Sequence, residues 1–264
     1  MIYFLSDAHL GTRVMANPYE HEKRVIQLLN EMKKDATHVY LLGDMFDFWF
    51  EYVWHDRSKR MYVSFIRTLN HMVKRGIHVH FFTGNHDIWT FGGLHQMTGM
   101  KIHHKPYSVT LNGKRIFMAH GDGLVPEDYV SKLPKKQQKR IRQFMKLRAF
   151  FHSPTAQFFY KLLPPTIGNA IGYEWSRRSR QKELDHPCPY KGEDQEELVL
   201  YSKEQEAKGP HYDYYIFGHR HIALDLQITK ESRVVILGDL FKQWTYAKMD
   251  EKGNLELCTV EQNN

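Results

Sequence analysis

Residues 38–47 have the sequence HVYLLGDMFD, in which an apolar run ends in a glycine and two aspartates. The run has the length and composition of a buried β-strand. Two more apolar runs lead into polar motifs in the same way, namely Ile2–Leu5 before Asp7-Ala8-His9 and Ile77–Thr83 before Gly84-Asn85-His86-Asp87. In open α/β sheets, residues just beyond the carboxyl ends of strands converge on one crevice. The three stretches therefore predict an α/β sheet with polar side chains gathered at one edge.

The rest of the chain also predicts helices and strands, except in a middle segment that has no strand pattern. Apolar residues at helical spacing predict helices over 19–34 and 58–75, and Asn112-Gly113 predicts a hairpin between strands 108–111 and 115–119. Further strands are expected at 214–217, 224–228, 234–237, 246–249 and 255–260. The segment in between is aromatic-rich and has no strand rhythm. The simplest interpretation is an α/β core, residues 1–122 and 192–264, with a helical insertion at 123–191.

Composition and charge exclude several classes of protein. The chain has 264 residues, enough for one large core, and its two cysteines, Cys188 and Cys258, are too few for a disulfide framework. We therefore expect a cytoplasmic protein, without an export signal and without a membrane span, which needs roughly 18 uninterrupted apolar residues. The net charge is +7, yet residues 123–191 alone hold 14 Lys/Arg against 5 Asp/Glu, a net +9. An anionic partner is expected at that segment.

Five polar motifs stand where the predicted strands end. They are Asp7-Ala8-His9, Gly43-Asp44-Met45-Phe46-Asp47, Gly84-Asn85-His86-Asp87, His120-Gly121-Asp122 and Gly218-His219-Arg220-His221. Taken singly, an Asp-x-His or a Gly-Asp is typical of an ordinary surface turn. Together they supply carboxylate, imidazole and amide ligands without a thiolate, a set that suits Mn²⁺, Fe or Zn²⁺ better than a structural zinc. The combination favours a metal site over five unrelated turns.

The motif set resembles the signature of the calcineurin-like metallophosphoesterase superfamily: D-x-H, GD-x-x-D, GNHD, a later His and GH-x-H. The resemblance implies an αββα sandwich and an enzyme with two divalent metal ions. It implies three groups of ligands: Asp7, His9 and His221 on one ion, Asn85, His120 and His219 on the other, and Asp44 as a bridge. Two such ions can activate a water molecule and clamp a phosphate.

Four other residues of these motifs are expected to assist the metals. His86 is not expected to be a ligand; it is a candidate catalytic group that donates a hydrogen bond to phosphate or protonates the leaving group. Asp87 is the candidate that orients this imidazole. Asp47 and Asp122 are expected mainly to hold ligands and loops in place, and Asp122 is also a candidate substrate contact.

The basic segment 123–191 has two interpretations. It could be a small helical subdomain whose aromatic residues pack on one another beneath a solvated charged face. Alternatively it is a lid that combines an acyl-binding surface with cations for phosphates and anionic lipid headgroups. The second interpretation also predicts peripheral contact with the inner face of the cytoplasmic membrane.

A narrower resemblance favours the lid. The stretches Phe4–Gly11, Leu42–Trp49 and Ile236–Leu240 are similar to the UDP-2,3-diacylglucosamine hydrolases of lipid A synthesis. That family releases UMP from a UDP-linked lipid and leaves 2,3-diacylglucosamine 1-phosphate (lipid X). The resemblance implies this lipid-linked UDP-sugar as substrate, and Mn²⁺ as the expected metal ahead of Fe or Zn²⁺.

The chain departs from the best-known branch of that family at one motif position and in the insertion. His86 stands where that branch has arginine. The branch also contacts its substrate through a Ser, an Asn and a Lys of the insertion, and the nearest segment here is 176–182. From that segment we expect three substrate contacts, Arg178, Ser179 and Arg180.

Three alternatives stay open from the sequence. The same core could serve another nucleotide, protein or small-molecule phosphoester. A nuclease would also use basic residues, but the aromatic residues of 123–191 cluster with Leu and Ile rather than as spaced stacking platforms, so no nucleic-acid partner is expected. A scaffold without metals is disfavoured because every ligand of the motif set is present. The sequence indicates no protein partner, and it leaves the oligomeric state open.

Overall fold

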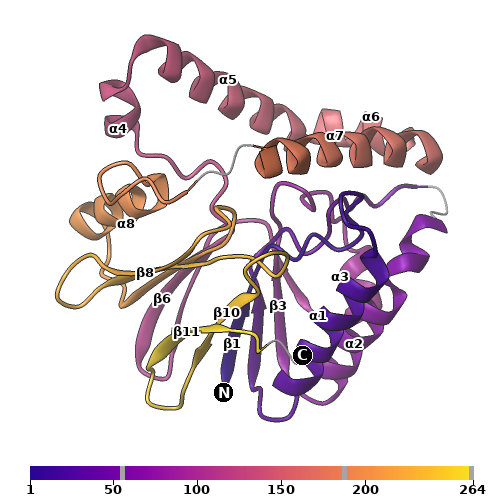
Figure 1. Cartoon of the computed structure of the whole chain (residues 1–264), viewed down its shortest axis with the longest axis horizontal. Helices are drawn as coiled ribbons and strands as arrows, with labels where there is room; N and C mark the ends of the chain where they lie inside the picture. Colours follow the sequence, from indigo (N-terminus) through magenta and orange to yellow (C-terminus); the bar gives the residue numbers. More distant parts are fainter. Residues whose placement is uncertain (54–56, 186–188, 262–264) are drawn as a thin grey trace.

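The computed structural model describes residues 1–53, 57–185 and 189–261 and consists of two β-sheets with helices on their outer faces (Figure 1). The first sheet has the strand order β11-β10-β1-β2-β3-β4. Its strands are β1 (Ile2–Leu5), β2 (His38–Leu41), β3 (His78–Phe82), β4 (Lys101–His103), β10 (Thr245–Met249) and β11 (Leu255–Thr259). The second sheet has the order β5-β6-β7-β9-β8. Its strands are β5 (Tyr107–Leu111), β6 (Lys114–Ala119), β7 (Tyr214–Phe217), β8 (Ala223–Gln227) and β9 (Arg233–Leu237).

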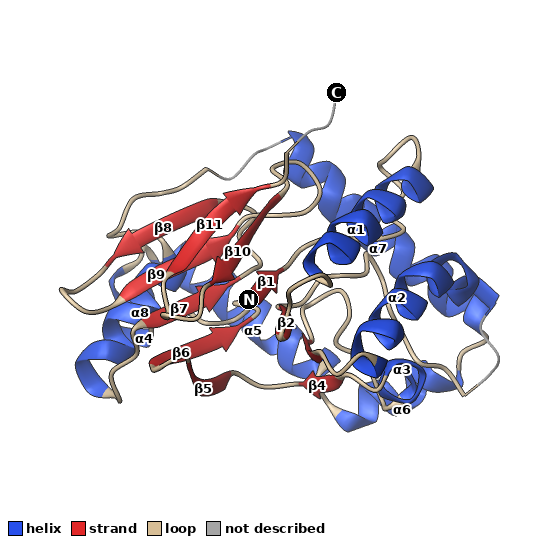
Figure 2. Ribbon diagram, turned by 90° about the horizontal axis from the view of Figure 1, so that it is seen from below, coloured by secondary structure: helices blue, strands red, loops and turns tan. Residues whose placement is uncertain are grey.

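Helices cover the outer face of each sheet. Against the first sheet lie α1 (Pro18–Met32), α2 (Val63–Lys74), which follows the 3₁₀ turn η1 (Arg57–Tyr62), and α3 (Gly93–Thr98). Against the second lies α8 (Glu197–Lys208). Figure 2 shows α1, α2 and α3 together on one side of the molecule and α8 on the other. A separate apolar cluster, which includes Phe4, Leu42 and Val235, fills the space between the sheets. These layers confirm the predicted α/β class and the two-sheet sandwich.

Local sequence explains why α1 begins and which face it buries. Asn17 accepts a hydrogen bond from the backbone N–H of Glu20, and Pro18 occupies the first turn, where its missing N–H costs nothing. Val25, Leu29 and Met32 then recur at helical spacing and are buried against the first sheet.

The strand register brings the motifs to one end of the sandwich. β1, β2 and β3 are parallel, with Leu5 opposite Leu41 and Leu41 opposite Phe81. In the second sheet β6 and β7 are parallel, with Ala119 opposite Phe217. All five strands therefore end at the same edge, as predicted, and the polar residues that follow them face one another.

Four helices lie between β6 and α8, across that same end of the sandwich (Figure 1). They are α4 (Glu127–Lys132), α5 (Lys135–Phe151), α6 (Pro154–Leu162) and α7 (Pro165–Asp185). Only α7 has buried residues among the four. No helix in the described ranges is long and apolar enough to cross a membrane. The predicted boundaries at 123 and 191 fall outside these helices, and the division into core and insertion stays a prediction.

Helix α7 fits closely on the sandwich because two glycines face it. A Cβ on Gly172 would lie 2.2 Å from the ring of Phe48, and a Cβ on Gly168 would lie 2.3 Å from the hydroxyl of Tyr52. Next to Gly172, Tyr173 is buried, and its hydroxyl lies 2.9 Å from that of Tyr62. Ring packing and a buried hydrogen bond thus join α7 to the loops that carry the motifs.

Several elements differ from the sequence prediction. The Asn112-Gly113 hairpin and the five C-terminal strands are confirmed to within one or two residues. The helix predicted over 58–75 begins as a 3₁₀ turn, and α3, β4 and α8 were not predicted. The six-residue α3 and the three-residue β4 are too short for a periodic signal. Cys188 lies outside the described residues.

Candidate active site

The seven predicted metal ligands meet at the carboxyl end of the strands. Two triads have possible ligand atoms within 4.8 Å of one another: Asp7, His9 and His221, and Asp7, Asp44 and His120. Asp7 belongs to both, so the two triads adjoin.

The two ligands outside these triads lie beside them. Asn85 Oδ1 is 3.3 Å from His120 Nε2. The backbone N–H of His219 donates to Asp7 Oδ2 at 2.9 Å, and the His219 ring lies 5.1 Å from the ring of His120, centroid to centroid. The motifs therefore form one cluster.

The loops that carry these ligands have an unusual backbone. Seven described residues other than glycine have a positive φ, and five of them are predicted ligands: Asp7, His9, Asp44, His219 and His221. This left-handed conformation costs an ordinary residue of order 1–3 kcal/mol and persists only where the surroundings enforce it. The concentration at one place indicates a functional constraint on how these side chains point.

Two glycines of the motifs are required for space. A Cβ on Gly84 would lie 2.2 Å from Asp44 Oδ1, and a Cβ on Gly218 would lie 2.5 Å from Asp7 Oδ2. The neighbouring strands thus approach the two carboxylates more closely than any side chain would allow. Glycine is therefore required at these two positions because of close approach.

The electrostatics of the site suit cations. Burial alone would raise the pKa of Asp44, but the imidazoles of His120 and His86 lower it below its ordinary value. Burial alone would lower the pKa of His120, and the carboxylate of Asp44 raises it above the ordinary value. Two buried carboxylates, Asp7 and Asp44, thus depend on nearby positive charge. Together with the imidazole nitrogens they form a donor set that fits a dimetal centre.

Neighbouring groups show which face two of the site histidines present, and a hydrogen bond fixes that face for His120. His120 Nδ1 donates to the carbonyl oxygen of Leu42 at 2.8 Å, so Nε2 points toward Asp44. His9 directs Nε2 toward Asp7 at 3.8 Å, while its Nδ1 lies 3.7 Å from Asp47 Oδ1. Asp47 thus lies beside a predicted ligand without a hydrogen bond to it within the described residues, and its supporting role stays a prediction.

His86 lies at the centre of the cluster. Its Nδ1 donates to the carbonyl oxygen of Asp47 at 2.8 Å, which leaves Nε2 as the acceptor nitrogen of a neutral ring. Burial lowers its pKa, as does the charge of Arg180. It also lies within 4.8 Å of His9 and Asp44 as a possible ligand group, although the motif resemblance gives it no ligand role.

Asp87 has a different role from the expected one. Its carboxylate accepts hydrogen bonds from the backbone N–H groups of Gly84 at 2.7 Å, Met45 at 2.9 Å and Asp44 at 3.3 Å. Within the described chain it forms no hydrogen bond with the imidazole of His86. Asp87 therefore fixes two ligand loops to each other, and the carbonyl of Asp47 orients the imidazole instead.

One face of α7 completes the site. Ser176 Oγ lies 3.3 Å from His86 Nδ1, and the Trp175 ring lies 4.9 Å from the His86 ring. The guanidinium of Arg180 lies 3.4 Å from His86 Nε2 and 3.3 Å from His221 Nδ1, and the side chain is 7% exposed. Glu183, one turn further, lies 2.6 Å from His221 Nδ1.

The substrate contacts expected on this helix are only partly at the site. Arg180 is at the site, whereas Arg178 is 76% exposed and donates to Glu174 on the outer face. Ser179 is half-buried and makes no side-chain hydrogen bond within the described residues. Ser176, Trp175 and Glu183 were missed. Ser176, Arg180 and Glu183 share one helix face with Tyr173, so helical spacing groups them only once Tyr173 is known to face the sandwich.

An apolar cavity opens beside this cluster, on the side of Asn85 and Asp122. Asp122 is buried and accepts a hydrogen bond from Arg148 of α5 at 2.5 Å. The cavity has a volume of about 180 Å³. Most of its lining is apolar: Phe48, Ile88, Trp89, Phe144, Leu147, Phe151, Ile171 and Trp175. It thus lies between the ligand loops and helices α5 and α7.

Comparison with known proteins agrees with this geometry. The pattern of the calcineurin-like phosphoesterase family matches residues 1–223. A Porphyromonas gingivalis protein named UDP-2,3-diacylglucosamine hydrolase is 36% identical over 94% of this chain and 94% of its own length. A Haemophilus ducreyi protein of the same name is 26% identical over 95% and 97% of the two chains. With its Asp and His cluster suited to two metals, the chain belongs to the calcineurin-like phosphoesterase family and is a metal-dependent hydrolase.

Proposed function

We propose that this hydrolase cleaves the pyrophosphate of UDP-2,3-diacylglucosamine with water, giving 2,3-diacylglucosamine 1-phosphate and UMP in lipid A synthesis. The observation that carries the proposal is the apolar cavity at Asn85 and Asp122, which lies directly beside the proposed metal site. The two similar proteins named for this activity support the same substrate.

The proposed ligands divide between two ions as the motifs suggest. Asp7, His9 and His221 would hold one ion, Asn85, His120 and His219 the other, and Asp44 would bridge them. We propose Mn²⁺, with Fe or Zn²⁺ as alternatives that this ligand set also accepts. When bound, such a pair lowers the pKa of a water molecule and neutralises charge on the phosphate.

The chain's own residues would bind and orient the pyrophosphate. Arg180 is a buried cation whose Nε has no hydrogen-bond partner among the described residues, so it could donate to a phosphate oxygen. His86 presents Nε2 to the same space, where it could bind the phosphate or transfer a proton to the leaving oxygen. Both groups lie next to the proposed ligands, at the place where the scissile bond must be.

The lipid part would lie under the helical segment, which we propose is a lid over residues 123–191. The side chains of Phe144, Leu147 and Ile171 are each about half exposed, at 48%, 53% and 53%, and they line the cavity. Burying this surface under acyl chains would contribute roughly 25 cal/mol per Å². Apolar contact of this kind would distinguish the lipid nucleotide from a simple phosphodiester.

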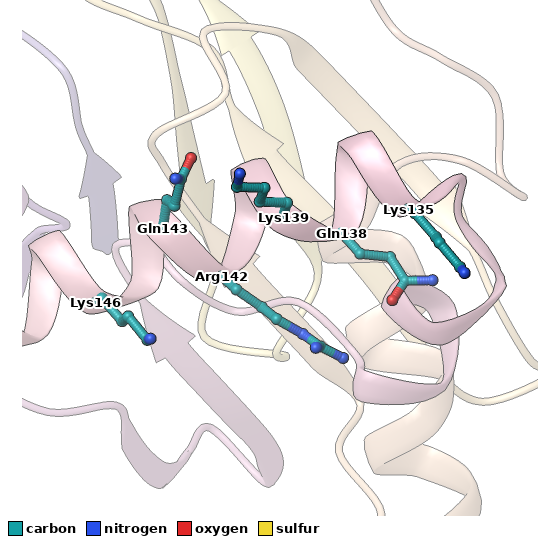
Figure 3. A pocket seen from close by; sticks show the side chains of 6 residues that line it. All are labelled: Lys135, Gln138, Lys139, Arg142, Gln143 and Lys146. Atoms are coloured by element: carbon teal, nitrogen blue, oxygen red, sulfur yellow. The ribbon is translucent and has the colours of Figure 1, made fainter.

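The outer surface of the same helices favours peripheral contact with the cytoplasmic face of an anionic membrane. Phe150, Phe158 and Phe159 are about 60% exposed. Along α5, cations line a shallow groove together with two glutamines (Figure 3); they are Lys135, Lys139, Arg142 and Lys146. Aromatic anchors beside cations are typical of reversible binding to anionic lipid. Sedimentation with anionic vesicles at low salt tests this, and no pelleting would contradict it.

The decisive experiment measures UMP release from UDP-2,3-diacylglucosamine with added Mn²⁺, beside hydrolysis of bis(p-nitrophenyl) phosphate. We expect strong turnover of the lipid nucleotide and little of the generic ester. Turnover of the generic ester alone would keep the phosphoesterase and reject the lipid substrate. UDP-N-acetylglucosamine, which lacks the two acyl chains, is the matched control for the cavity.

A further inference from the structure

His221 is held from outside the sandwich, unlike His120. The ring nitrogen of His120 that faces away from the proposed metals, Nδ1, donates to the carbonyl oxygen of Leu42, a residue at the end of a core strand. In His221 the corresponding nitrogen, Nδ1, instead lies 2.6 Å from Glu183 Oε1 of α7. The other ring nitrogen of His221, Nε2, lies 3.0 Å from Asp7 Oδ1. His221 therefore lies between a carboxylate of the core and a carboxylate of the helical segment.

The second oxygen of Glu183 holds another site residue. Arg180 donates through NH1 to Glu183 Oε2 at 2.6 Å, and its other nitrogen, NH2, lies 3.4 Å from His86 Nε2. Glu183 is 28% exposed in its side chain, so its two contacts are shielded from most solvent. One carboxylate thus links α7 to a proposed metal ligand and to the cation proposed to bind phosphate.

A carboxylate in this position has a known physical effect. A hydrogen bond accepted from one ring nitrogen of a histidine fixes the tautomer, so the other nitrogen keeps a lone pair for a metal, and its basicity rises. With Nδ1 donating to Glu183, Nε2 of His221 is the nitrogen directed at Asp7 and at His9 Nε2, which is 3.2 Å away.

We propose that Glu183 is a positioning residue that couples docking of α7 to metal binding at His221. The inference depends on the proposed assignment of His221 as a ligand. Because coupling between two equilibria is reciprocal, metal binding at His221 should hold α7 on the sandwich, and a docked α7 should raise the affinity for the metal. The helical segment would then close fully only over a loaded site.

The first test measures Mn²⁺ binding without substrate, by the electron paramagnetic resonance signal of free Mn²⁺. Substitution Glu183→Ala should weaken the affected Mn²⁺ site about 10- to 100-fold, the range usual for loss of a partner to a metal-binding histidine. Glu183→Gln keeps an acceptor oxygen and should lose less. The matched control is Glu174→Gln, which removes a glutamate on the outer face of the same helix, where it pairs with Arg177 and Arg178.

Wild-type affinity in Glu183→Ala would overturn the proposal, as would an equal loss in Glu174→Gln. Melting temperatures in EDTA check that each variant folds, and Glu183→Gln decides the question if the alanine variant does not. Mn²⁺ binding with no UMP release by the wild type would reject the proposed substrate and leave this inference standing.

The second test measures limited trypsin cleavage within 123–191, a segment with 14 Lys and Arg. Mn²⁺ should slow cleavage of the wild type and of Glu174→Gln severalfold, and should leave the rate in Glu183→Ala unchanged. Equal protection of wild type and Glu183→Ala would contradict the coupling, because Mn²⁺ would then protect the helical segment without the link that Glu183 provides.

Discussion

The ligand loops and the helical segment lie against each other but are built in opposite ways. In the loops the key side chains are buried, five have left-handed backbone, and Asp87 fixes two loops together. In the helical segment α5 and α6 bury no residue and touch the sandwich loops through partly buried rings, whereas α7 has buried residues. The geometry of the ligand loops is thus enforced by buried contacts on several sides, whereas the helical segment meets the sandwich through fewer buried contacts.

The largest loss of activity is expected from a substitution in the ligand loops. Asp44→Ala removes the proposed bridge, so it should reduce hydrolysis of any phosphoester to below about a thousandth of wild type, because both metals lose a ligand. Steady-state rates with the lipid nucleotide and with bis(p-nitrophenyl) phosphate check this. A variant that kept most of its rate would reject the bridging role.

The next largest effect is expected at His86, the residue of the ligand loops that contacts α7. His86→Ala should lower kcat about 10²- to 10⁴-fold if the ring transfers a proton, yet should leave Mn²⁺ content unchanged if the ring is not a ligand. Metal analysis of the purified variant distinguishes the two roles. Loss of one metal ion per chain would show that His86 is a ligand.

A smaller effect is expected in α7, where the buried Arg180 can be compared with the exposed Arg178. Arg180→Ala should lower kcat/KM for the lipid nucleotide about 100-fold, since a buried donor to the phosphate is lost. Arg178→Ala should stay within about twofold, because exposed ion pairs such as the one with Glu174 contribute little. Equal losses in the two variants would show that α7 acts through its total charge rather than through one guanidinium.

The same comparison explains what the sequence could predict. The ligand loops were predictable because each motif follows a buried strand, and parallel strands bring such motifs together whatever the side-chain detail. His120, for example, follows β6 directly, and its ligand role was implied by the motif resemblance. The exchange of roles between Asp87 and Asp47 was not predictable, since it depends on which backbone N–H groups the folded loops leave free.

The contacts of α7 were predictable only in part. Arg178 and Ser179 were predicted from their place in the segment 176–182, which resembles the family's contact segment, but that resemblance does not say which side of the helix faces the core. Gly168, Gly172 and Tyr173 define that side by their packing on Tyr52, Phe48 and Tyr62. The orientation of the helix, and with it the position of Glu183, follows from tertiary contacts that no local pattern contains.

The smallest expected effect lies in the sandwich, away from both regions. His80 on β3 donates to or accepts from His103 on β4 at 2.9 Å, and the two rings stack. Burial, together with the neighbouring positive groups, lowers the pKa of each to about 4. The folded state therefore binds fewer protons than the unfolded state, whose histidines titrate near 6.5.

The stability contributed by these two neutral rings is complete above about pH 6.5 and is lost as the pH falls toward 4. His103 is buried and His80 is half-buried, and solvent near His80 reduces the loss to about 1–2 kcal/mol for the pair. Urea unfolding at pH 7 and at pH 4.5 would measure it, and His80→Leu should make the free energy of unfolding less dependent on pH. An unchanged pH dependence in that variant would show that other groups cause the acid sensitivity; His21, His38, His104 and His152 also have lowered pKa values.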